Sequence, residues 1–437
     1  MGAAAADRRL LLAGGAAALA AFPAAARVGR PTLRVAARDL ALFALPMLEM
    51  AGTRGRAFGA GLTANRFRHV RNLTTASTQK VTQPNNDTLY STAWLDLSAG
   101  PVRISLPKAG ERYMSLALMD MFTNNFAVLH GGAPRQLLIV GPQAPDAPGA
   151  IRAPTNWVWA LGRTLVADPA DLPAAHAIQD SLIAEGASNR SPASAPPRDA
   201  PWPVFFAGAA RLLADTPPSA ADQRWLAQAS AGLIEGGRFD PARFRSREGD
   251  EIAAGLAEAL EIARRGDEAG ERREGWLYPK PNLGRFGADF RYRAQIALSG
   301  LAALPVEEAL YLRALSPDGG SEIDSSRPWR LRLPFAARPP VEGFWSLTIY
   351  EIAPSGQAFL IDNPLQRYAI GDRTPGLADA GGDIDILISA SAPPSTSSRF
   401  WLPAPTSGRP FLLSFRAYRP AASMLDGRYR MPVLRPA

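Results

Sequence analysis

Four acidic residues stand where a carboxylate could act as an acid, a base or a nucleophile. Asp87 precedes the strand-like segment 89–97, Asp120 follows the apolar segment 114–119, Glu351 closes the motif FWSLTIYE, and Asp372 lies in the turn GDRTPG. Two carboxyl groups about 5–9 Å apart can hydrolyse a glycosidic bond. We therefore predict Asp87, Asp120, Glu351 and Asp372 as catalytic candidates, with Asp87 and Asp120 forming a pair if their strand ends are neighbours.

The stretch QPNNDTLYSTAWLDL, residues 83–97, supplies candidate binding groups but has a second interpretation. Asparagine tolerates turn backbone angles, and Pro84 biases Gln83 toward an extended conformation, so a turn that leads into a strand also explains the pattern. Strand alternation places Tyr90 and Trp94 on one face with Thr92 and Asp96, and such a wall could stack on a sugar or lie in a subunit interface. The predicted binding residues here and after the next strand are Asn85, Asn86, Tyr90, Trp94 and Asn124.

A second polar set lies near the C-terminus. Its predicted binding residues are Tyr350, Asn363, Arg367, Tyr368 and Arg373. Arginine can clamp a carboxylate or phosphate with two parallel hydrogen bonds, which suits an anionic substrate. The same segments carry turn signals, and an ion pair between Asp372 and Arg373 that stabilises a loop is the simpler alternative.

Composition excludes several classes of site. The chain has no cysteine, which rules out thiol catalysis and zinc–thiolate centres, and its three histidines are too far apart in sequence for a histidine metal motif. No G-x-S-x-G elbow occurs. Calcium held by carboxylate and amide oxygens in loops such as 380–385 stays open as a minor alternative, although the spacing does not match an EF-hand. The net charge of +8 is almost all arginine and is dispersed, so we predict no nucleic-acid partner, no metal and no cofactor.

The N-terminal 26 residues have the order of a signal peptide. Arg8 and Arg9 precede a short alanine- and leucine-rich run, and small residues at 24–26 offer a cleavage point. Paired arginines before a modest apolar run are typical of a twin-arginine signal, while an ordinary secretory signal or an uncleaved anchor is the alternative. We expect a periplasmic or secreted protein with no stable membrane insertion after the signal is removed.

The spacing of apolar and turn residues in the remaining chain predicts a mainly β protein with a helical middle segment. We expect residues 27–190 to form a helix followed by a β-sandwich, 191–275 a helical insert or linker, and 276–437 a second β-sandwich. Closely spaced apolar strands separated by Gly, Pro, Asp and Ser turns favour antiparallel sandwiches or jelly rolls at both ends.

Ordered motifs in both β-rich ends resemble a known family. NNDTLYSTAWLDL, GPVRISLP, RYMSLALMDMFTNNFA and PTNWVWALGRTLV resemble domain of unknown function 1254, and FWSLTIYE, NPLQRYAIGDRTPG, FLLSFRAYRP and LDGRYRMPVL resemble its companion, domain of unknown function 1214. The resemblance implies tandem jelly-roll-like β-sandwiches and a homo-oligomer, with a trimer as the common case, and it implies no settled activity. Asn86 stands where the family commonly has arginine, which puts a basic group there in doubt.

Two functions remain open from the sequence. The first is an exported envelope hydrolase that acts on a glycan or a related polar substrate by carboxylate acid/base chemistry. The second is a non-catalytic ligand-binding or assembly protein of the envelope, in which the same residues stabilise turns and subunit contacts. Both expect a small-molecule or glycan ligand or a second copy of the chain as partner.

Overall fold

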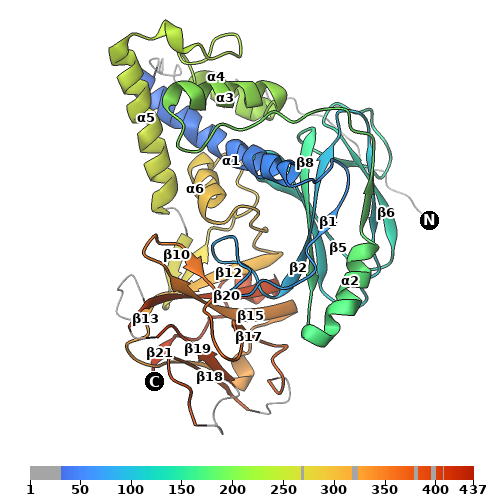
Figure 1. Ribbon diagram of the computed structural model, residues 1–437, viewed down its shortest axis with the longest axis vertical. Coiled ribbons are helices and arrows are strands. Elements are labelled where there is room, and N and C mark those ends of the chain that lie inside the picture. Colours follow the sequence, from blue (N-terminus) through green and yellow to red (C-terminus); the bar gives the residue numbers. More distant parts are fainter. Residues whose placement is uncertain (1–30, 267–269, 317–322, 378–381, 395–399, 407) are drawn as a thin grey trace, which may run out of the picture.

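The structure is a computed structural model that describes residues 31–437 apart from 267–269, 317–322, 378–381, 395–399 and 407. The predicted signal peptide lies outside the described residues. No helix in the described part of the chain combines the length and apolar character needed to cross a bilayer. Figure 1 shows an N-terminal sandwich, a helical layer and a C-terminal sandwich in one molecule.

The N-terminal sandwich consists of two sheets around one core. Its five-stranded sheet has the order β1-β2-β8-β4-β5, and its four-stranded sheet the order β7-β6-β3-β9. The strands are β1 (Arg68–His69), β2 (Thr88–Asp96), β3 (Val102–Leu106), β4 (Met114–Met119), β5 (Asn125–His130), β6 (Arg135–Val140), β7 (Ile151–Arg152), β8 (Trp157–Leu165) and β9 (Ile183–Glu185). Alternate residues such as Leu95, Ile104 and Val158 point inward and form a shared hydrophobic cluster, as strand periodicity requires.

The C-terminal sandwich repeats this plan with a larger sheet. An eight-stranded sheet runs β10-β11-β12-β20-β15-β16, with β13 on β20 and β17 on β15, and it faces a four-stranded sheet of order β19-β18-β14-β21. The strands are β10 (Gly270–Arg273), β11 (Trp276–Pro279), β12 (Ala309–Ala314), β13 (Ile323–Asp324), β14 (Trp329–Leu333), β15 (Val341–Ile352), β16 (Ala358–Phe359), β17 (Ala369–Gly371), β18 (Ile384–Ser389), β19 (Trp401–Pro403), β20 (Pro410–Pro420) and β21 (Arg435–Pro436). Leu331, Leu347 and Phe415 belong to the core between these sheets.

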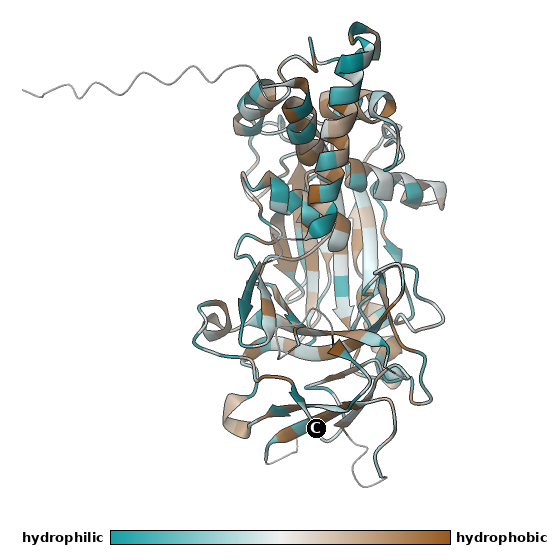
Figure 2. Ribbon diagram, turned by 90° about the vertical axis from the view of Figure 1, so that its left-hand side faces the viewer, coloured by the Kyte–Doolittle hydropathy of each residue, from teal (hydrophilic) through white to brown (hydrophobic). Residues whose placement is uncertain are grey.

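The helical layer covers one face of the N-terminal five-stranded sheet. Its helices are α1 (Leu33–Gly59), α3 (Trp202–Asp215), α4 (Ala220–Ala229), α5 (Ser246–Arg265) and α6 (Phe290–Ser299). Their apolar sides form one cluster with Trp94 and Trp157 of the sheet. Figure 2 shows the helices gathered at the end of the molecule opposite the C-terminus. Two further helices, α2 (Leu172–Asp180) and α7 (Ala422–Leu425), lie outside this layer.

Local sequence explains where the long helices begin and end. The Thr32 side chain accepts a hydrogen bond from the Val35 amide and caps α1, and Gly266 ends α5 in the left-handed conformation that glycine adopts at low cost. Gly255 lets α5 approach α1 closely, because a Cβ at this position would lie 2.2 Å from the Arg34 carbonyl oxygen. The helical insert predicted from the sequence therefore packs against α1, which precedes it in the chain, and α6, which follows it.

The two sandwiches meet through sheet faces that are both buried. In β15, Leu347 and Ile349 point into the C-terminal core, whereas Ser346, Thr348 and Tyr350 are buried on the opposite face. That opposite face contacts residues 76–87, the segment that leads into β2. The predicted fold class, mainly β with a helical middle and a sheet sandwich at each end, is confirmed; jelly-roll connectivity stays a prediction.

Candidate functional site

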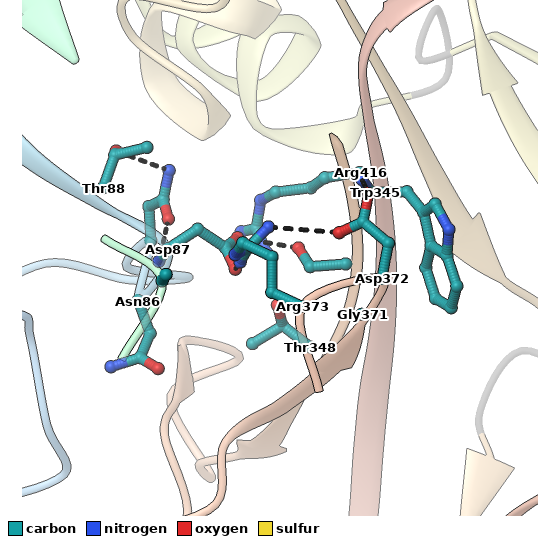
Figure 3. Close-up of polar contacts among 12 residues, drawn as sticks. Asn86, Asp87, Thr88, Trp345, Thr348, Gly371, Asp372, Arg373 and Arg416 are labelled. Atoms are coloured by element: carbon teal, nitrogen blue, oxygen red, sulfur yellow. Dashed lines mark hydrogen bonds and ion pairs between the residues drawn. The ribbon is translucent and has the colours of Figure 1, made fainter. Parts of the chain in front are cut away.

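The predicted site residues Asp87 and Arg373 meet at the junction of the two sandwiches. Asp87 lies directly before β2 and is 4% exposed, and Arg373 follows β17. The Asp87 Oδ1 accepts a hydrogen bond from Arg373 Nη2 at 2.8 Å, and its Oδ2 accepts one from the Ser346 hydroxyl at 2.7 Å. Both carboxylate oxygens of an N-terminal residue are thus bound by C-terminal groups, as Figure 3 shows for Arg373 beside Asp87.

Asp372 lies on the other side of the same guanidinium group. Its carboxylate accepts a hydrogen bond from the Trp345 amide at 3.1 Å and one from Arg373 Nη1 at 3.4 Å, and its side chain is 31% exposed. Burial raises the pKa of Asp372 to about 6, and the negative charge of Asp87 adds to the rise. Asp372 therefore changes protonation in a range where acid/base chemistry is possible.

Arg416, which the sequence analysis did not single out, extends the cluster and bonds the predicted residue Tyr350. Its Nη1 donates to the Thr348 hydroxyl at 2.8 Å, and its Nη2 donates to the Tyr350 hydroxyl at 2.6 Å. The Tyr350 hydroxyl in turn donates to the Pro84 carbonyl at 2.8 Å. In Figure 3 the Arg416 side chain extends toward Asp87.

Sequence reasoning missed Ser346, Thr348, Arg416 and Tyr418, although a signal was present. In FLLSFRAYRP, which spans most of β20, Ser414, Arg416 and Tyr418 alternate with apolar residues. Such alternation places all three side chains on one face, and an arginine inside an otherwise apolar strand indicates that this face meets something polar.

The segment 76–87 is fastened to the C-terminal sandwich along most of its length. The Gln79 side chain donates to the Leu360 carbonyl and accepts from the Leu360 amide. The Gln83 backbone amide donates to the Ala358 carbonyl at 2.7 Å, and the Asn85 side-chain amide donates to the Tyr418 hydroxyl at 2.9 Å. Gln83 has a φ of 48°, so the extended conformation expected before Pro84 is wrong. Contacts with another domain outweigh the local preference at this position.

Asp120 does not join this cluster. Its carboxylate accepts hydrogen bonds from the amides of Phe122 and Asn124 and from the Asn124 side chain, which is a turn cap, and burial raises its pKa. Strand β8 shows how far apart the two residues are. The Asp87 carbonyl accepts a hydrogen bond from the Val166 amide, directly after the end of β8, whereas Met119, the neighbour of Asp120, pairs with Trp159 near the start of β8. At about 3.3 Å per residue the two carboxylates are on the order of 20 Å apart, too far for a catalytic pair.

The remaining C-terminal candidates hold loops together. Glu351 forms an ion pair with Arg409 at the surface. Asn363 accepts a hydrogen bond from the Arg367 amide at 3.1 Å, and Arg367 Nη1 donates to the Trp401 carbonyl at 2.9 Å. The Tyr368 hydroxyl accepts a hydrogen bond from the Ala76 amide at 3.3 Å and so belongs to the junction between the sandwiches.

The wall predicted on β2 exists, but other elements cover it. Trp94 is fully buried, stacks on Trp159 with ring centroids 5.3 Å apart and contacts the helical layer, so it cannot stack on a sugar from solvent. Tyr90 keeps part of its surface and packs beside the Arg163 guanidinium, 5.5 Å from the ring centroid. The Asn86 amide group donates to the Thr74 carbonyl and points away from Asp87 in Figure 3.

Two hollows on the surface lie away from the predicted residues. One of about 390 Å³ lies between α1 and residues 195–198, and one of about 490 Å³ lies beside β10 and Tyr429. Across the described ranges no three His, Asp or Glu side chains converge as metal ligands would. The arrangement around Arg373 offers a carboxyl group of raised pKa beside a cation.

Comparisons with known proteins bear on the fold and the family. A family model described as protein of unknown function (DUF1254) matches residues 64–185, and a second, protein of unknown function (DUF1214), matches residues 308–422. No curated protein matches the chain significantly. Among solved structures, the VPA0106 protein from Vibrio parahaemolyticus is similar at a TM-score of 0.69 and 22% identity, over 93% of this chain and 100% of that one.

A putative uncharacterized protein from Burkholderia cenocepacia is a weaker match, at a TM-score of 0.44 and 11% identity over 90% of this chain and 86% of that one. At these identities the VPA0106 match supports the fold alone, while the two family models account for the motifs in both sandwiches. The chain belongs to the proteins that combine a DUF1254 domain with a DUF1214 domain.

Proposed function

We propose that the chain is an exported, non-catalytic protein of the cell envelope that binds a ligand or assembles with other copies. In this proposal the polar contacts at the junction hold the two sandwiches in one orientation. One observation carries this proposal. Asp87, the central predicted acid, gives both carboxylate oxygens to Arg373 and Ser346 of the other sandwich and is 4% exposed. A carboxylate so occupied is poorly placed to receive a substrate, and it is well placed to hold two domains together.

Neighbouring residues support the same function. Asn85, Tyr350 and Tyr368 each bond across the junction between the sandwiches. Export rests on the order of charged, apolar and small residues in the first 26 positions. Assembly as a homo-oligomer is part of the proposal and is checked by the molecular mass of the purified protein in solution.

The test replaces Asp87 by asparagine and uses Asp96→Asn as the matched control. Asp96 is buried, as Asp87 is, but its carboxylate accepts hydrogen bonds from Ser98 and Ser188 of its own sandwich region. We expect Asp87→Asn to uncouple the unfolding of the two sandwiches, whereas Asp96→Asn lowers stability without uncoupling them. Wild-type protein is also incubated with a panel of polysaccharides and esters, and no turnover is expected. Turnover that Asp87→Asn abolishes without changing the melting curve would overturn the proposal.

A second function, hydrolysis of a glycan or a related polar substrate, is favoured by Asp372. Its carboxyl group is partly exposed, has a pKa raised by burial to about 6 and lies next to Arg373. Because both carboxylates bond one planar guanidinium group, their bonded oxygens are at most roughly 9 Å apart, a limit compatible with the separations found in glycosidases. For this function we expect turnover whose pH profile has an inflection near 6 that Asp372→Asn removes.

A further inference from the structure

The face of the N-terminal sheet that meets the C-terminal sandwich carries a buried arginine without a counter-ion. Arg163 of β8 is 4% exposed, and its Nη2 donates to the Ala302 carbonyl at 3.0 Å. Its Nη1 is buried and has no hydrogen-bond partner, and within the described part of the chain no carboxylate lies at ion-pair distance from it. A buried guanidinium group left in this state is costly unless an anion comes to it.

Arg163 stands beside a tyrosine, and the facing sheet repeats that combination. Tyr90 of β2 pairs directly with Arg163 of β8, and Tyr311 of β12 pairs directly with Arg416 of β20. Tyr311 packs in one hydrophobic cluster with Leu165, which lies two residues beyond Arg163 on β8, and it is within electrostatic reach of both arginines and of Tyr90. The two pairs therefore lie near each other across the junction. Tyr90 and Tyr311 both keep part of their surface accessible.

The second arginine also lacks a carboxylate of its own. Arg416 is 5% exposed and donates to the hydroxyls of Thr348 and Tyr350. The nearby Asp87 is already bound by Arg373 and Ser346. Two cations are thus gathered with neutral phenol groups, and the carboxylate closest to them is occupied.

The other buried arginines have a different environment. Arg293 is 1% exposed and also has unpartnered nitrogens, but its guanidinium group lies over the Phe43 ring in the apolar cluster of the helical layer. Arg373 is less buried and forms an ion pair with Asp87. Arg54 also has an unpartnered Nε, but it lies over the Trp157 ring in the apolar cluster of the helical layer. Among these groups, Arg163 alone combines an unpartnered nitrogen with phenol hydroxyls and a second arginine opposite.

We propose that Arg163, Arg416, Tyr90 and Tyr311 form a binding site for an oxyanion, a phosphate or carboxylate group, between the two sandwiches. Arg163 Nη1 donates to the anion, Arg416 adds positive charge from the facing sheet, and the two phenol groups supply further donors. The proposal goes beyond the function proposed above, since it requires neither export nor an absence of turnover.

The test is titration calorimetry of the purified protein with inorganic phosphate and, separately, with succinate, in chloride buffers of matched ionic strength. We expect binding of at least one of the two anions, and the stronger one identifies the phosphate or the carboxylate class. Arg163→Gln should bind roughly 10- to 100-fold more weakly, because one charge-assisted hydrogen bond is lost. Arg54→Gln, the matched control, should bind like wild type.

Two isosteric variants keep the proposal testable if Arg163→Gln does not fold. Tyr90→Phe and Tyr311→Phe each remove one hydroxyl group and should weaken the same anion by a smaller factor. The proposal is overturned if the wild type binds neither anion above the chloride control. It is overturned equally if Arg163→Gln or both phenylalanine variants, once folded, bind as tightly as Arg54→Gln.

Discussion

Asp372 is the residue whose environment most directly predicts a measurable pH effect. Burial raises its pKa to about 6, above the value near 3.9 of an unfolded chain, so the folded state holds this proton more tightly than the unfolded state. The resulting penalty is absent below about pH 4, grows through pH 6 and then remains, with an upper limit of about 3 kcal/mol. We expect Asp372→Asn to gain stability relative to wild type as the pH rises from 4 to 7, measured by urea unfolding at both pH values.

An aspartate with the opposite shift provides the control. Hydrogen bonds from the Phe335 amide and from Arg332 hold the pKa of Asp383 below its usual value. Its contribution is therefore present above the unfolded pKa and lost as the pH falls, so Asp383→Asn should approach wild-type stability on acidification. If the free energy of unfolding of Asp372→Asn instead falls relative to that of the wild type between pH 4 and 7, the folded protein stabilises the carboxylate anion. The acid role proposed for Asp372 then fails.

At the scale of elements, the contact between α1 and α5 depends on one glycine. A Cβ at Gly255 would lie 2.2 Å from the Arg34 carbonyl oxygen and 2.8 Å from the Ala37 Cβ, so the helices must move apart to accept a methyl group. We expect Gly255→Ala to lower the free energy of unfolding by about 1–3 kcal/mol, measured from the midpoint of urea unfolding.

Gly55 of α1 is the matched control for this substitution. It is exposed, and a Cβ there would meet nothing within 4 Å. Alanine is a better helix former than glycine, so Gly55→Ala should be neutral or stabilise by up to about 1 kcal/mol. Equal effects of the two substitutions would show that helix propensity, rather than the close approach of the helices, decides the outcome.

Much of the element pattern could be predicted from the sequence, because alternation is a local property. The faces expected for β2 are those observed: Leu95 lies in the sandwich core, and Tyr90 and Trp94 lie on the other face. What covers that face could not be predicted, since the helical layer and the C-terminal sandwich reach it from segments far away in the chain. For the same reason Trp94 was interpreted as a binding surface, when it is core.

The same limit applies to the candidate site: contacts between neighbours in sequence could be predicted, and contacts between distant segments could not. Asp372 and Arg373 are adjacent in the sequence, and the ion pair predicted between them is present. The partnership of Arg373 with Asp87 joins residues 286 positions apart and depends on how the two sandwiches dock. The proposed pairing of Asp87 with Asp120 failed because their strand order and direction, which only the sheet register reveals, place them at opposite ends of β8.

For the whole molecule, the central point is that the eight-stranded sheet is buried on both faces. Its inner face packs against the four-stranded sheet, and its outer face meets the N-terminal sandwich through polar side chains of β15 and β20. Polar contacts of this kind fix one docking orientation, because a misplaced partner leaves buried donors and acceptors unpaired. The two sandwiches should therefore unfold as one cooperative unit.

Tyr350→Phe tests that cooperativity. The Tyr350 hydroxyl joins the Pro84 carbonyl of the N-terminal segment to Arg416, and its removal leaves both buried groups short of a partner, at a cost of about 1–3 kcal/mol. Tyr429→Phe is the control, because its hydroxyl donates to the Ala337 carbonyl inside the C-terminal region. In scanning calorimetry we expect Tyr350→Phe to lower the ratio of van't Hoff to calorimetric enthalpy, as two transitions separate, and Tyr429→Phe to shift the midpoint alone. An unchanged ratio in Tyr350→Phe would mean that apolar contacts such as Tyr113 against Phe344, and not the polar junction, couple the two sandwiches.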